Sequence, residues 1–307
     1  MSLRHVSVPW TWILSFALAV VAGGCGGSDE PHEGYASVGG RRLFYETRGS
    51  GCPVLFIGGG SAMDSRQWSE VMTALEDSTR VLRYDPAAIG QSDVPRTSFS
   101  EEGDLLGLLD ELGISRAVVV GNSSAGGLAL EFALASPDRT RAVVAIAPFV
   151  SGWEFSPEMQ ERVALFGKAL SEGVDAFLRA ALADPHFVPA PDNPAARRTA
   201  GNLIRNNYQK MLSIDPALIE APSLPLMERV GGIQVPVLLI VGELDHPDLH
   251  RRVNALDRLI PISMTLELPA SGHTPTLENP RELAGTLGSF LDEIGWRGEG
   301  CDASGGR

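Results

Sequence analysis

The segment Ala117-Val-Val-Val-Gly-Asn-Ser-Ser-Ala-Gly-Gly127 places serines where a β-branched run gives way to small residues. A serine hydroxyl is a weak nucleophile unless it is held exposed and a base takes its proton. A sharp strand-to-helix turn provides the exposure, and small flanking residues let the helix pack back on the strand. The first N–H groups of the helix can also stabilise an oxyanion. The segment therefore predicts Ser123 as a nucleophile and the N–H of Ser124 as half of an oxyanion hole.

The turn Gly121-Asn-Ser-Ser-Ala125 resembles the nucleophile elbow of the α/β-hydrolases, Gly-x-Ser-x-Gly, with Ala at the last small position. The resemblance implies an α/β-hydrolase fold, which is a mostly parallel central sheet with flanking helices and a helical lid insertion. Ser124 offers a competing register, because Asn122-Ser-Ser-Ala-Gly126 also ends in glycine. We favour Ser123 because glycine then stands two residues before the nucleophile.

An acid and a histidine occupy suitable positions further along the chain. Val235-Pro-Val-Leu-Leu-Ile-Val-Gly-Glu-Leu-Asp245 is typical of a buried strand that opens into a loop carrying Glu243 and Asp245. His273 lies on a glycine-containing loop just past another apolar run. Members of the family carry Ser, acid and His in this order, each after its own strand. The resemblance implies that His273 takes the proton of Ser123 while Asp245 orients the imidazole, with Glu243 as the alternative acid.

A second oxyanion donor is expected from the loop after an earlier strand, Pro53-Val-Leu-Phe-Ile57. The loop reads Gly58-Gly-Gly-Ser61, and glycines allow the backbone to approach a tetrahedral intermediate closely. Family members usually carry His-Gly at the start of this loop, where this chain has Gly-Gly. We predict that the N–H of Gly60 or Ser61 faces the oxyanion. A phosphate-binding loop is disfavoured because no lysine follows the glycines.

The rest of the pattern is that of one α/β domain. Residues 35–46 predict a hairpin that turns at Gly39-Gly40, and alternating strand and helix patterns follow it. Ser98-Phe-Ser-Glu101 is a capping-box pattern that predicts the start of a helix running through Leu112. The hydrolase core is expected over residues 35–148 and 233–296, and a disordered tail over 297–307.

The alternation stops at Pro148 and resumes at Val235. In this family an insertion at this point is the helical lid, so residues 149–232 are predicted to cover the active site. Helix-like patterns span 156–173 and 174–183, and a proline-rich break follows. The side chains that could line a substrate pocket are Trp153, Phe155, Phe166, Phe177, His186 and Phe187.

The composition and charge of the chain limit the kinds of molecule that it is expected to bind. The 307 residues, 44% of them hydrophobic, can supply one large core, and the net charge of −13 argues against a nucleic-acid surface. His246 and His250 have the spacing of a metal pair, but Pro247 lies between them and no other ligands surround them. We therefore expect a small-molecule substrate, no metal and no cofactor. The oligomeric state is left open.

The N-terminus resembles a bacterial lipoprotein signal. A short basic start and an apolar run from Val6 to Ala22 precede Gly-Gly-Cys25, which resembles a lipobox with Ala at the position where Leu is more usual. The resemblance implies a signal peptide over residues 1–24, diacylglycerol on Cys25 and a tether over 25–34. An ordinary cleaved signal peptide and an uncleaved anchor remain alternatives. All three readings place the enzyme outside the cytoplasm, and the first tethers it to a membrane of the cell envelope.

Two other cysteines remain, Cys52 near the first core strand and Cys301 in the tail. Export would permit a disulfide between them. We expect instead a buried Cys52 and a free thiol at Cys301, because the two residues lie at opposite ends of the domain sequence.

The triad indicates a serine hydrolase without specifying the acyl group. Asn122 beside the nucleophile resembles the elbow of carbon–carbon bond hydrolases, whereas the lid and the segment Gly242 to His250 resemble esterases and enol-lactonases. We favour hydrolysis of a carboxylic ester or lactone, with cleavage of ring-fission diketones as the alternative. A receptor that keeps its triad but turns over little is a third possibility from a different class.

Overall fold

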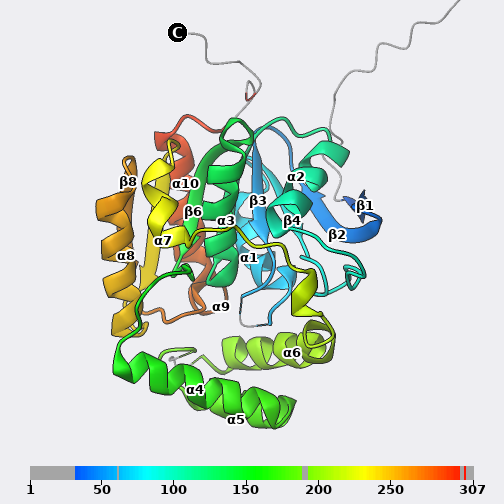
Figure 1. Ribbon diagram of the computed structural model, residues 1–307. Coiled ribbons are helices and arrows are strands. Elements are labelled where there is room, and N and C mark those ends of the chain that lie inside the picture. The colour runs from blue at the N-terminus through cyan, green and yellow to red at the C-terminus, as the bar shows by residue number, and fades with distance from the viewer. Residues whose placement is uncertain (1–31, 61, 189–192, 298–300, 302–307) are drawn as a thin grey trace, which may run out of the picture.

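The computed structural model describes residues 32–60, 62–188, 193–297 and 301. The predicted signal peptide, Cys25 and Ser61 lie outside these residues. Within them, a central sheet is covered by helices on both faces, and three further helices lie together at one end (Figure 1). This arrangement is the predicted α/β-hydrolase fold.

The sheet has eight strands in the order β1-β2-β4-β3-β5-β6-β7-β8. The first two strands are antiparallel, β2 meets β4 in antiparallel fashion, and all other neighbours are parallel. Parallel strands end at the same edge of a sheet, so the loops after β3, β5, β7 and β8 are brought together. The strands are β1 (His32–Val38), β2 (Arg41–Arg48), β3 (Pro53–Ile57), β4 (Arg80–Tyr84), β5 (Ala117–Asn122), β6 (Thr140–Ile146), β7 (Val237–Gly242) and β8 (Ser263–Leu268).

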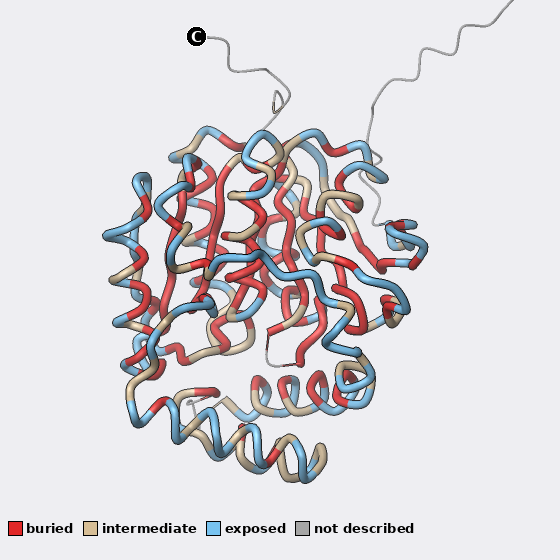
Figure 2. The backbone as a smooth tube through the Cα atoms, in the orientation of Figure 1, coloured by how far each residue is buried: buried red, intermediate tan, exposed pale blue. Residues whose placement is uncertain are grey.

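Alternate residues of the central strands face two separate apolar layers. Leu55 and Ile57 of β3 pack with α2 (Glu101–Glu111), α3 (Ser124–Ala135) and α8 (Pro247–Leu259) on one face. Val54 and Phe56 pack with α1 (Ser69–Leu75) and α10 (Pro280–Glu293) on the other. Figure 2 shows this buried centre as a continuous band through the sheet. A sheet buried on both faces explains the almost unbroken apolar strands.

The insertion forms three main helices, α4 (Pro157–Ser171), α5 (Val174–Ala183) and α6 (Pro194–Met211). They lie together below the sheet in the view of Figure 1. The first two match the predicted helical patterns, whereas α6 was not predicted. Buried Asn207 joins α6 to the core, because its amide donates to Asp64 at 2.8 Å and its carbonyl oxygen accepts from the Gly90 N–H at 2.6 Å.

Short turns complete the chain: η1 (Ser65–Trp68), η2 (Pro137–Arg139), η3 (Pro216–Leu218), η4 (Val230–Gly232), α7 (Leu226–Arg229) and α9 (Pro275–Glu278). Across the part of the chain that the structure describes, no helix is both long enough and apolar enough to cross a membrane.

Two predicted boundaries are corrected by the structure. The hairpin does turn at Gly39-Gly40, both with positive φ, but β1 begins at His32, inside the predicted tether. The capping prediction was wrong by two residues, since Ser100 rather than Ser98 caps α2 and accepts from the Gly103 N–H at 3.0 Å. The reason is that Phe99 is held extended, bonded on both sides to the segment around Ile219.

Of the two cysteine predictions, the buried Cys52 is confirmed and the free thiol at Cys301 is wrong. Cys52 and Cys301 form a disulfide that joins the start of β3 to the C-terminal segment, 249 residues away in sequence. The expectation of a free thiol in a disordered tail therefore fails at Cys301. The chain passes through α10 and Trp296, whose indole donates to the Pro53 carbonyl at 2.9 Å, and this contact brings the two cysteines together.

Candidate active site

The predicted elbow joins β5 to α3. Ser123 lies between them with φ 58° and ψ −119°, a conformation that L-residues rarely adopt, and Ser124 begins the helix. A Cβ atom at Gly121 would come within 2.1 Å of the Ala125 carbonyl oxygen, so only glycine fits there. The turn is therefore strained at Ser123, as expected for an exposed nucleophile.

Asp245 and His273 follow β7 and β8, and the structure brings them together. The Nδ1–H of His273 donates to Oδ2 of Asp245 over 2.8 Å, and the Asp245 side chain is fully buried. Burial alone would raise the pKa of Asp245, but the charge and hydrogen bond of His273 outweigh it and hold the pKa below its ordinary value. The pair can fix one tautomer of the imidazole, with Nε2 left to accept a proton.

Glu243, the alternative acid, lies elsewhere. It is exposed and accepts a hydrogen bond from the Ala270 N–H at 2.8 Å. Its contact stabilises the loop after β8 without touching the imidazole. Of the two acids on the loop after β7, only Asp245 contacts His273.

The loop after β3 lies against the elbow. The N–H groups of Gly58 and Gly59 are used inside the fold, on the carbonyls of Tyr84 and Met63. Gly60 has φ 76°, and a Cβ atom there would meet the Asn122 carbonyl oxygen at 2.7 Å, so the two loops approach more closely than a side chain would allow. Gly60 and Ser124 both border the same cavity, and their N–H groups have no acceptor among the described residues. Ser61, the other predicted donor, lies outside those residues.

This cavity has a volume of about 300 Å³. Its floor is the glycine loop and the start of α3, and its roof is formed by lid side chains such as Leu170, Phe177 and Met211. Among the described residues that line it, most are apolar, and the one charged side chain is Glu101 at the start of α2. The capping-box pattern assigned Glu101 only a role at the helix start, so its place in the cavity was not predicted.

Two hydrogen bonds join the lid directly to the loops that carry His273 and Asp245. The His273 N–H donates to the His186 carbonyl at 2.9 Å, and the His186 ring Nδ1–H donates to the Leu244 carbonyl at 2.9 Å. The Phe187 ring lies 6.4 Å from that of His273. His186 is therefore a loop residue that connects the lid to the loops after β7 and β8.

Of the other predicted pocket aromatics, only Phe177 lines the cavity. Phe166 packs against Phe177, Phe155 packs against the core, and the Trp153 ring lies under Arg251. Phe187 is buried in the lid's own apolar cluster. These four residues hold the lid in place rather than line the pocket.

Glu278 was not predicted as part of the site. Its carboxylate accepts hydrogen bonds from the N–H groups of Gly272 and Thr274, on either side of His273, at 3.0 to 3.1 Å. Burial raises its pKa to about 7, against the lowering effect of these bonds. The available signal was the run Thr274-Pro-Thr-Leu-Glu278, a helix start with an acid in its first turn.

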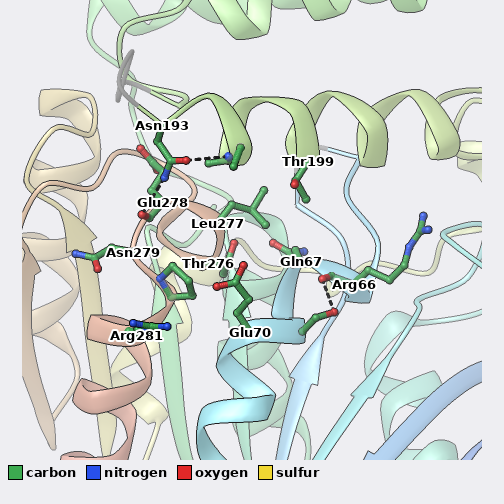
Figure 3. Close-up of a pocket in the computed structure, with 14 residues that line it drawn as sticks. Arg66, Gln67, Glu70, Asn193, Thr199, Thr276, Leu277, Glu278, Asn279 and Arg281 are labelled. Atoms are coloured by element: carbon green, nitrogen blue, oxygen red, sulfur yellow. Dashed lines mark hydrogen bonds between the residues drawn. The ribbon is translucent and has the colours of Figure 1, made fainter.

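Glu278 also borders a second cavity of about 510 Å³, formed by α6, α9 and the segment η1–α1. Figure 3 shows Asn193 of the lid above Glu278, with Arg66 and Glu70 on the opposite wall. The two cavities share no lining residue among the described residues, so this larger cavity is separate from the one at the elbow.

The two histidines with metal-pair spacing have other partners. His246 caps α8 by accepting the Asp248 N–H at 3.1 Å, and Nδ1 of His250 lies 3.3 Å from Glu267. Within the described residues, no group of three or more His, Cys, Asp or Glu could hold a metal ion.

Comparison with known proteins agrees with this geometry. Residues 54–286 match the model of the Alpha/beta hydrolase family. The RutD protein of Azorhizobium caulinodans, named as a candidate carbamate hydrolase, is 32% identical over 85% of this chain and 98% of its own length. The enol-lactonase of Burkholderia xenovorans LB400 has a TM-score of 0.69 and 27% identity over 84% of this chain and 100% of that one. An esterase of Thermogutta terrifontis, 22% identical, shares the fold with a TM-score of 0.72 over 86% of this chain and 99% of its own. The chain is therefore an enzyme of the alpha/beta hydrolase family.

Proposed function

We propose that the chain is a serine hydrolase that cleaves a carboxylic ester or lactone of a small organic substrate. The observation that carries the proposal is the hydrogen bond between His273 and buried Asp245, at the sheet edge where Ser123 is held with positive φ. A strained serine at an elbow and an oriented imidazole are the two parts that nucleophilic attack on a carbonyl needs.

The reaction follows from these parts. Ser123 Oγ attacks the carbonyl carbon as His273 Nε2 takes its proton, and the negative charge moves to the carbonyl oxygen. The N–H groups of Gly60 and Ser124 stabilise that oxyanion. The intermediate collapses as His273 returns the proton to the departing alcohol oxygen. Water then attacks the acyl-enzyme by the same steps and releases the acid.

Asp245 acts through the imidazole. Its carboxylate holds Nδ1 protonated and stabilises the imidazolium that forms during attack. It remains ionised because its pKa lies below the ordinary value. This division of roles needs neither a metal nor a cofactor.

Ester or lactone cleavage is favoured over carbon–carbon cleavage by the surroundings of Asn122. The resemblance to carbon–carbon hydrolases rests on this residue and on the length of the loop from Asp85 to Asp93. The Asn122 amide donates to the Ile146 carbonyl at 3.3 Å, and its side chain is buried. Asn122 is not part of the cavity lining. It therefore stabilises the end of β5 rather than contacting substrate.

The test is steady-state hydrolysis of a panel of p-nitrophenyl esters, lactones and ring-fission dienones by the purified full chain. Many turnovers per active site on esters or lactones support the proposal. Turnover confined to the dienones would replace it with carbon–carbon hydrolysis. A single burst of product without turnover would favour the receptor.

We further propose that the enzyme is exported and tethered to a membrane through diacylglycerol on Cys25. The lipobox-like Ala22-Gly-Gly-Cys25 behind a short apolar run is the main ground. The disulfide between Cys52 and Cys301 adds support, because such bonds persist in oxidising compartments and are rare in the cytosol.

A further inference from the structure

The cavity at the elbow combines an apolar wall with one acidic group. Leu128 of α3 and Leu170, Phe177 and Met211 of the lid supply the apolar surface. Glu101 supplies the acid, from the first residue of α2. Since a liquid water molecule takes up about 30 Å³, a cavity of about 300 Å³ holds a small substrate group. Any group that fills it is within reach of Glu101.

Among the described residues, the one structural role of Glu101 is its place in the first turn of α2, where the helix dipole favours an acid. Ser100 caps α2, so the carboxylate of Glu101 is not needed to complete a capping box. Among the described residues, no hydrogen bond or ion pair engages it, and the nearby cation Arg41 is paired with Asp104 instead. Glu101 is an exposed residue that borders the cavity.

Among the described residues, the charges that shift the pKa of Glu101 are acidic. Enclosure by protein, and then the charges of Glu102 and Asp104, raise the pKa of Glu101 to about 7. The Tyr84 hydroxyl of β4 also lies within its electrostatic reach, and the lid residues that face the cavity carry no charge. A cation placed beside Glu101 would relieve this repulsion, and apolar walls would strengthen the attraction.

We propose that Glu101 binds a positively charged ammonium group on the substrate, so that the enzyme prefers esters or lactones bearing an amine or quaternary ammonium group. This inference rests on the proposed function, because the cavity adjoins Ser124 of the elbow. Glu101 is then a specificity-determining residue: it holds the cationic end while the ester carbonyl lies at Ser123. The remaining apolar surface contacts the linking carbon chain.

The test compares esters that differ only in charge. On the alcohol side, 2-(trimethylammonio)ethyl acetate is matched by 3,3-dimethylbutyl acetate. On the acyl side, p-nitrophenyl 4-(trimethylammonio)butanoate is matched by p-nitrophenyl 5,5-dimethylhexanoate. In at least one pair, kcat/KM for the cation should exceed that for the neutral ester on the order of tenfold at pH 8. The ratio should fall as pH drops through about 7, since Glu101 then becomes neutral. Any effect of pH on the catalytic steps that the two esters of a pair share cancels in the ratio.

Two variants test whether the preference for the cationic ester depends on the carboxylate of Glu101. Glu101→Gln should reduce the ratio to one or below. Glu102→Gln removes an equal charge from the next residue, which does not line the cavity, and should leave the preference for the cation in place. Equal ratios in wild type and Glu101→Gln, or no preference in either pair, would overturn the proposal. A wild-type preference for the neutral esters would mean that Glu101 acts as a neutral hydrogen-bond donor.

A binding measurement separates this proposal from the proposed function. Calorimetry with Ser123→Ala needs no turnover, and the cationic ester should bind on the order of tenfold more tightly than its neutral partner at pH 8. Adding Glu101→Gln should remove the difference. If wild type hydrolyses none of the esters while this difference persists, the ester chemistry fails and the cation site stands. If wild type hydrolyses the esters but the cationic and neutral esters bind with equal affinity, the ester chemistry stands and the cation site fails.

Discussion

The carboxylate of Glu278 accepts a hydrogen bond from the N–H of Thr274 at 3.0 Å, directly after His273 in sequence. The same carboxylate accepts from the Gly272 N–H and from the Thr274 hydroxyl, so it holds the backbone on both sides of the imidazole. Asp245 orients the ring, and Glu278 fixes the loop that carries it. Glu278 is thus a positioning residue that acts through His273.

The raised pKa of Glu278 makes the stability of the enzyme depend on pH. The pKa is about 7 in the folded chain against 4.5 for an ordinary glutamate, so between these values the folded state holds a proton that the unfolded state has released. The free energy of unfolding should therefore fall as pH rises from 4.5 to 7, by on the order of a few kcal/mol. Glu278→Gln should flatten this slope in urea titrations and lower kcat more than it changes KM. Glu282→Gln, an exposed acid on α10, is the control, and an unchanged slope in Glu278→Gln would contradict the assignment.

The next prediction concerns the register of the elbow. Ser123→Ala should reduce kcat by on the order of 10⁴ to 10⁶, because it removes the attacking oxygen. Ser124→Ala should keep most of the activity, since alanine retains the backbone N–H that faces the cavity. A fluorophosphonate probe followed by mass spectrometry should place the adduct on Ser123. An adduct on Ser124 would show that the other register is correct.

The acidic member of the triad can be identified by replacing each of the two candidate carboxylates with its amide. Asp245→Asn should reduce kcat by about 10⁴, because an asparagine favours the wrong imidazole tautomer. Glu243→Gln should cost little, since its carboxylate contacts only the Ala270 N–H. In wild type, Asp245 should stay ionised near neutral pH because its pKa is lowered. The opposite ranking of the two variants would move the acid to Glu243.

Much of the fold could be predicted from the sequence because its signals are local. Each of these signals, whether an apolar run of strand length, a turn glycine or the elbow motif, depends only on residues that are close in sequence. The structure confirms the predicted sheet and the hairpin at Gly39-Gly40. Helix α6 was not predicted because it is polar overall. Its burial is explained only by its contacts with the core, such as the hydrogen bond from the Asn207 amide to Asp64. Its pattern alone does not show what it packs against.

Other features depended on contacts between distant segments. The cap of α2 moved to Ser100 because Phe99 pairs with the segment around Ile219, more than a hundred residues away. The same shift left the Glu101 side chain free to face the cavity. Similarly, the disulfide follows from the path of α10 back to β3, which no spacing of cysteines reveals.

The disulfide should stabilise the fold measurably. It closes a loop of 249 residues, and removal of such a bond costs about 2–5 kcal/mol. The double variant Cys52→Ser/Cys301→Ser should therefore show a lower Tm than wild type under oxidising conditions. A reductant should lower the Tm of wild type toward that of the variant and leave the variant unchanged. Equal Tm values for the two oxidised proteins would mean that the bond contributes no stability.

The last prediction is that the enzyme is held at a membrane by lipid on Cys25 rather than by a spanning helix. Acyl chains contribute about 0.8 kcal/mol per buried CH₂, so more than one chain on a single residue can anchor the protein without help from its acidic domain. Cys25→Ser should block lipidation and leave precursor or a differently processed protein, visible by mass spectrometry and by release from the membrane fraction.

A chain that starts at Gly26 should be soluble and fully active, because Ser123, Asp245 and His273 all lie in the domain that follows. Cys52→Ser is the matched control: it also removes one cysteine, but it should leave the protein in the membrane fraction. An unmodified residue at the N-terminus of the mature native protein would refute the lipid anchor. An unmodified terminus on an exported, soluble enzyme would favour an ordinary signal peptide in its place.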